Sequence, residues 1–140
     1  MTTRSPSDLA LAQRIPHVDA YDKRQIAIVH FLSHRDFGGT AFFRQRSTGF
    51  ETVDAERARP YLDALAADLR THGDPPPAYV SDESKLFERT HLGEHRLDRA
   101  LIYRGNLLHC GWLGGADALP TRVLEGRLTV ASFLRPRTPA

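Results

Sequence analysis

The sequence predicts a mainly β fold, of the sandwich or jelly-roll kind, with one inserted helix. Short segments rich in β-branched and aromatic residues alternate with turn residues along most of the chain, and only one stretch has helical periodicity. The 140 residues are enough for one domain with its own core. We therefore expect residues 1–140 to form a single domain, with flexible ends at 1–13 and 135–140.

The clearest strand is predicted at 25–32, where the sequence QIAIVHFL is apolar on both faces. A strand with two apolar faces is typical of the centre of a sandwich. The paired glycines Gly38 and Gly39 suit a hairpin turn that needs positive φ, and they lead into a second strand at 40–44. Further strands are expected in the second half of the chain, at 86–92, 99–103, 106–110 and 127–134, the last as an apolar core strand.

One helix is predicted around 56–71. Tyr61, Leu65 and Leu69 recur at helical spacing, Pro60 falls in an early turn, and Gly73 lies just past the end. The helix interrupts an otherwise β-type pattern, so we expect it to be an insertion between strands.

Charge and composition exclude several classes of protein. The 19 basic and 17 acidic side chains give a net charge of +2, which is too balanced for a nucleic-acid-binding protein. No apolar run approaches the roughly 18 residues of a membrane span, and the N-terminus lacks the apolar core of a signal peptide. Cys110 is the single cysteine, so no internal disulfide can form and a cytoplasmic location is expected.

His17, Asp19 and His109 are the candidate metal ligands. His17 and Asp19 are two residues apart, so on extended backbone both side chains leave the same face and can chelate one divalent ion. This spacing is weak evidence alone, because it is common by chance. His109 lies in the apolar segment GNLLHCGW, where a histidine is either a hydrogen-bonded core residue or a ligand.

Arg127 and Thr129 strengthen the case for a metal site. An arginine at the start of a core strand needs a carboxylate partner, and its planar fork binds a carboxylate with two hydrogen bonds. Thr129, two residues on, could donate to the same group. Two histidines and one carboxylate leave three coordination positions open, as in non-haem Fe(II) oxygenases, whereas a structural zinc site is usually closed by cysteines. A 2-oxo acid would fill two of these positions while the arginine holds its far carboxylate.

The segments IPHVD, GGTAFFRQRSTGFE, YRGNLLHCG and GRLTVASFL resemble an uncharacterised bacterial family with GGTAFYRHRSTG and GNLLHSG motifs. That family is similar to oxygenases that depend on Fe(II) and 2-oxoglutarate and have the double-stranded β-helix (cupin-like) fold. The likeness covers roughly residues 14–135. It implies that His17, Asp19 and His109 bind iron and that Arg127 binds 2-oxoglutarate. Only 16 residues precede His17, so the fold is expected to be shortened at its start.

The leading hypothesis is thus an oxygenase that hydroxylates an unidentified small molecule or amino-acid-derived substrate. A cupin-like protein that uses a divalent ion without oxidation is a second hypothesis. The third is a non-catalytic remnant of the oxygenase fold, in which Asp19 would turn away from both histidines. Tyr103 and Asn106, just before His109, are further candidates for binding the 2-oxo acid. An exposed sheet edge at the shortened start would favour a homodimer.

Overall fold

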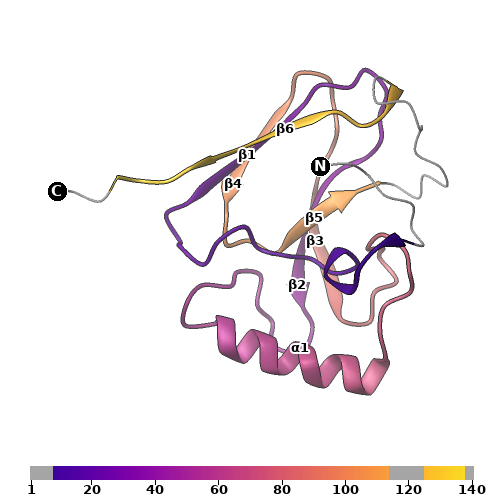
Figure 1. Cartoon of the computed structure of the whole chain (residues 1–140), viewed down its shortest axis with the longest axis vertical. Helices are drawn as coiled ribbons and strands as arrows, with labels where there is room; N and C mark the ends of the chain where they lie inside the picture. Colours follow the sequence, from indigo (N-terminus) through magenta and orange to yellow (C-terminus); the bar gives the residue numbers. More distant parts are fainter. Residues whose placement is uncertain (1–7, 114–124, 138–140) are drawn as a thin grey trace.

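A computed structural model describes residues 8–113 and 125–137 (Figure 1). The chain is mainly β, with two antiparallel three-stranded sheets and one α-helix. A short 3-10 helix at Leu11–Gln13 precedes the strands, which are β1 (Ile26–Phe31), β2 (Gly39–Gln45), β3 (Phe87–Gly93), β4 (Ala100–Arg104), β5 (His109–Trp112) and β6 (Thr129–Leu134). Helix α1 (Ala58–His72) lies between β2 and β3 in the chain. None of the described helices has the length and apolar character needed to cross a membrane.

Each sheet places strands that are distant in sequence next to one another. One sheet has the order β4-β1-β6 and the other the order β3-β2-β5. The strand predicted at 25–32 is the centre of its sheet, so that prediction is confirmed. Strand β2 is the centre of the other, paired with β3 through a register shift between Phe42 and Phe43 and with β5 without one.

Helix α1 packs on the outer face of the β3-β2-β5 sheet. Alternation along β2 sends Ala41 and Phe43 to this face, where they meet Tyr61 and Leu65 of the helix. The helix ends where predicted, because Gly73 has φ 77° and its N–H bonds to the Leu69 carbonyl. In Figure 1 the helix lies at the bottom, away from β6.

The opposite face of this sheet looks toward the β4-β1-β6 sheet. Phe42 of β2 meets Tyr103 of β4 edge-on, with ring centroids 5.1 Å apart. Tyr103 also contacts the ring of His109, at 4.8 Å. The predicted ligand His109 therefore lies between the two sheets, not among the residues under the helix.

Two predictions about the second half of the chain are wrong. The strand predicted at 106–110 begins at His109, because residues 105–106 form the turn after β4. Strand β6 is no core strand: it pairs only with β1 among the described strands, and Val130, Phe133 and Leu134 are each about half exposed, at 47%, 52% and 57%. Arg127 lies two residues before β6 and does not open it.

The predicted flexible ends fall partly outside the described residues. Within 8–13, however, Leu9 is buried and its carbonyl accepts a hydrogen bond from Arg14 Nε. Residues 9–14 therefore pack against the domain and bring the chain to His17. At the other end, residues 135–137 are exposed.

The buried thiol of Cys110 gives a direct test of this packing. Burial raises the pKa of Cys110 to about 12, so at neutral pH the group is a thiol and a poor nucleophile. We expect alkylation of the native protein to be at least about a hundredfold slower than in denaturant, since only the unfolded chain exposes an ordinary cysteine. Mass spectrometry of timed iodoacetamide reactions measures both rates. Equal rates would mean that β5 is not packed against α1.

Candidate metal centre

Backbone pairing brings the three candidate ligands together. His17 and His109 form an isolated antiparallel bridge in which each N–H donates to the other's carbonyl, both at 2.9 Å. Directly paired residues of this kind project their side chains to the same face, and the two imidazole centroids lie 4.5 Å apart. The Asp19 N–H donates to Gly105 at 2.7 Å, which fixes the carboxylate beside the rings.

The candidate ligand atoms form one cluster that could hold a metal ion. One ligand atom from each of His17, Asp19 and His109 lies within 4.8 Å of the other two. Asp19 Oδ1 is 3.9 Å from His17 Nε2, and Oδ2 is 3.4 Å from His109 Nε2. Atoms that each lie about 2 Å from one ion are about 3–4 Å apart. Asp19 faces both histidines and does not turn away from them.

The hydrogen bonding of His109 favours a cation at this point. Its Nδ1 lies 2.8 Å from the Leu107 carbonyl, which can only accept, so Nδ1 carries a proton and donates. The Nε2 atom then faces the Asp19 carboxylate. Asp19 Oδ2 is buried and has no hydrogen-bond donor among the described residues. A cation or a proton placed between these two atoms would satisfy both. A histidine whose other ring nitrogen donates to a backbone carbonyl is typical of metal-bound histidine.

His17 forms the open side of the centre. Its side chain is 51% exposed, against 6% for His109 and 15% for Asp19. Partial burial of the ring and the neighbouring His109 lower the pKa of His17, against the opposing effect of Asp19. A lowered pKa keeps the imidazole neutral at pH 7, the form that binds metals. Exposure on the His17 side leaves a route for small ligands.

Arg127 is a half-buried cation near this centre. Its guanidinium lies 5.6 Å above the ring of Phe31, and Nη2 donates to the Gly39 carbonyl at 3.1 Å. The described part of the chain offers it no carboxylate within ion-pair distance, and its Nε is buried without a partner. Burial lowers the pKa of Arg127, although the group stays charged. The expected carboxylate partner is thus not among the described residues.

Tyr103 connects Arg127 with the candidate ligands. Burial and the charge of Asp19 raise its pKa, while Arg127 lowers it, so the phenol lies within electrostatic range of both. At neutral pH it is a protonated hydrogen-bond donor. Tyr103 thus lies near both the candidate ligands and the arginine, and its binding of a 2-oxo acid stays a prediction.

Thr129 and Asn106 have less direct relations to the centre. Thr129 pairs with Phe31, the residue under the Arg127 guanidinium, so both predicted anion-binding residues flank Phe31. Asn106 follows Gly105, whose carbonyl fixes Asp19, and its Oδ1 is buried without a partner among the described residues. No described contact joins Asn106 to the ligands.

Sequence reasoning missed Phe42. This residue is the centre of an aromatic row on the inner face, 6.3 Å from His109 and 6.1 Å from His91 by ring centroids. The signal was present in the alternation of β2, because Phe42 has the opposite parity to the core residues Ala41 and Phe43. Phe42 gives the space beside the ligands an apolar wall.

A second polar cluster lies apart from the predicted ligands. Ser33 Oγ is 3.1 Å from His95 Nε2, and His95 Nδ1 is 3.7 Å from Asp36 Oδ1. The order resembles a catalytic triad, but Nδ1 to Oδ1 is too long for a hydrogen bond and both Ser33 and His95 are buried. We interpret the Ser33–His95 pair as a satisfied core contact. His91 and His95 do not form a two-ligand helical pair, because His91 lies in β3.

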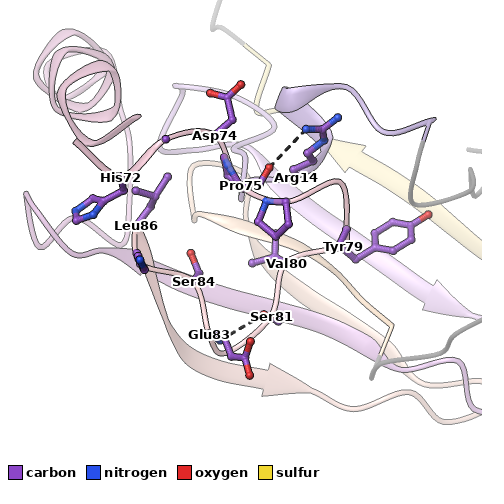
Figure 2. A pocket seen from close by; sticks show the side chains of 14 residues that line it. Arg14, His72, Asp74, Pro75, Tyr79, Val80, Ser81, Glu83, Ser84 and Leu86 are labelled. Carbon is purple, nitrogen blue, oxygen red and sulfur yellow. Dashed lines mark hydrogen bonds between the residues drawn. The ribbon is translucent and has the colours of Figure 1, made fainter. Parts of the chain in front are cut away.

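A cavity of about 280 Å³ lies between the end of α1, the loop at 73–86 and Arg14 (Figure 2). Arg14 Nη1 donates to the Pro75 carbonyl at 3.5 Å across one side of it. None of the candidate ligands lines this cavity. Tyr79, which does line it, lies close enough to Arg127 to affect its pKa. The cavity is thus a neighbour of the candidate centre but not part of it.

The fold and the site define a two-sheet β domain that carries a candidate centre of two histidines and one carboxylate. The chain belongs to the family of unknown function DUF6445, which it matches over residues 1–134. No curated protein and no solved structure matches it.

Proposed function

We propose that the chain is an Fe(II)- and 2-oxoglutarate-dependent oxygenase with a double-stranded β-helix fold. The observation that carries this proposal is a half-buried arginine without a described carboxylate partner, near a cluster of two histidines and an aspartate. A metal-binding protein that uses its ion only as a Lewis acid has no need of this arginine. A 2-oxo acid with a second carboxylate needs both the metal ion, which it chelates, and the arginine, which binds the far carboxylate.

The strand order supports the fold part of the proposal. Strands β1, β4 and β6 lie in one sheet and β2, β3 and β5 in the other, so the chain crosses between sheets at four of its five strand connections. The His17 bridge adds a further extended segment beside β5. Wrapping of this kind, with distant strands as neighbours, is typical of jelly rolls.

Each site residue has a separate task. His17, Asp19 and His109 would hold Fe(II), which when bound supplies the redox centre and orients the reactants. Arg127 would bind the far carboxylate of 2-oxoglutarate, and the protonated phenol of Tyr103 is placed to donate to the same ligand. Phe42 and Phe31 keep water away from this space. The net reaction converts 2-oxoglutarate, dioxygen and a substrate C–H group into succinate, carbon dioxide and a C–OH group.

The substrate would be a small molecule that enters on the exposed His17 side. A cytoplasmic location is part of the proposal, because the single cysteine favours a reducing compartment.

Anaerobic addition of Fe(II) and then 2-oxoglutarate tests the proposal. The expected result is a visible charge-transfer band that forms only when both are present. Air should then release succinate even without the substrate, through slow uncoupled turnover. Zinc in place of Fe(II) is the matched control, because it fills the site without giving a band. Folded protein that binds Fe(II) but gives no band with 2-oxoglutarate would leave the Lewis-acid alternative instead.

A further inference from the structure

The cavity between the end of α1 and the loop at 73–86 combines an apolar wall with a cation. Its volume of about 280 Å³ lies at the small end of the range for ligand pockets. Arg14 lines it together with apolar side chains that include Val80 and Leu86 (Figure 2). Leu86 belongs to the buried core under α1, and Val80 packs against that core. One wall of the cavity is therefore an apolar surface that the core holds in place.

Arg14 is anchored by the fold but is not neutralised by it. Its Nε donates to the carbonyl of the buried residue Leu9 at 2.9 Å, which fixes one side of the guanidinium. Nη1 reaches the Pro75 carbonyl only at 3.5 Å, the outer limit of a hydrogen bond. Within the described part of the chain, Nη2 has no acceptor and no carboxylate lies within ion-pair distance of Arg14. The guanidinium thus retains donors for a further acceptor.

The lining contains charges of both signs, and their exposure decides which ligand charge is favoured. Asp74 and Glu83 are exposed, as is the second cation, Lys85, whereas Arg14 is half-buried. Water and salt screen exposed charges strongly and partly buried charges much less. Arg14 therefore has the strongest effect on a ligand inside the cavity, and an anionic group is favoured over a cationic one. A carboxylate matches the planar fork of the guanidinium.

We propose that this cavity binds a small organic carboxylate with an apolar body. The carboxylate accepts hydrogen bonds from Nη1 and Nη2 of Arg14, and the apolar body lies against Val80 and Leu86. None of the candidate metal ligands lines the cavity, so the proposal does not rest on the proposed oxygenase function.

Titration of the metal-free protein with 3-phenylpropanoate, followed by NMR, tests the proposal. We expect a dissociation constant on the order of 1 mM, with the saturable shift changes concentrated at residues 78–86. The uncharged 3-phenylpropanamide has the same shape and should bind at least about tenfold more weakly, because it lacks the charge that strengthens the hydrogen bonds. Equal affinity for the two compounds, or no saturable change at residues 78–86, would overturn the proposal.

Three variants identify where the carboxylate binds, and circular dichroism checks their folding. Arg14→Gln should weaken 3-phenylpropanoate binding at least about tenfold. Ala78→Phe should weaken it as much, because Ala78 is a half-buried lining residue and the larger ring fills the cavity without removing the cation.

Arg127→Met is the control, since Arg127 does not line the cavity but lies close enough to the lining residue Tyr79 to be affected by it. This variant should bind the probe as tightly as the wild type does. Loss of binding in Arg127→Met with binding retained in Arg14→Gln would place the carboxylate beside the metal centre and overturn the proposal. Unchanged binding in folded Ala78→Phe would overturn it as well.

Discussion

Replacing His109 by alanine is expected to abolish metal binding by the domain. His109 is the most buried of the three candidate ligands, and its Nδ1–H bond to Leu107 presents Nε2 to the shared point. Loss of the groups that merely orient a ligand costs 10–100-fold in affinity, so loss of the ligand itself should cost at least about a hundredfold. Asp19→Asn keeps the shape of the site and removes its anion, and it should also lower the metal affinity.

Anaerobic calorimetry with Fe(II), and with Mn(II) as a redox-stable probe, measures this loss. His91→Ala is the matched control. His91 lies on the same aromatic row as His109 but is exposed and belongs to no ligand cluster among the described residues. The His91→Ala variant should therefore bind metal as tightly as the wild type does. If His109→Ala binds as tightly as His91→Ala does, the metal centre is not where we place it.

Much of the fold could be predicted because its signals are local. Alternation identified β1 and β2, helical spacing identified α1, and Gly73 marked its end. Strand β6 was misjudged for a physical reason. The sequence of residues 129–134 is as apolar as a core strand, but periodicity cannot reveal whether a second layer covers it. Burial depends on which elements pack together, and that information is not local.

The candidate ligands also depend on packing that the local sequence does not reveal. The spacing of His17 and Asp19 predicted a shared face, yet their meeting with His109 depends on one backbone bridge across more than ninety residues. Nothing near His109 in the sequence indicates that its Nδ1 bonds to Leu107. Arg127 was expected to open a core strand, whereas it precedes β6 and reaches back to Phe31 and Gly39.

Replacing Arg127 by methionine is expected to weaken 2-oxoglutarate binding without lowering the stability of the fold. Methionine retains an apolar chain over Phe31 but removes a half-buried charge that has no described carboxylate partner. Removing such a charge should leave the free energy of unfolding unchanged or raise it by about 1 kcal/mol. Affinity of the metal-loaded protein for 2-oxoglutarate should fall about thirtyfold or more, because a charge-assisted pair worth about 2 kcal/mol is lost. Metal affinity should not change.

This combination distinguishes a ligand-binding arginine from a structural one. A structural arginine would lower stability when removed and leave 2-oxoglutarate affinity unaltered. Urea unfolding of the metal-free protein and titration of the anaerobic Fe(II) form measure the two effects separately. Arg59→Met is the control, because Arg59 is 85% exposed on α1, paired with Asp63, and distant from the sheets' inner faces. Stability lost with affinity retained would remove 2-oxoglutarate from the proposal while leaving the metal centre in place, since Arg127 coordinates nothing.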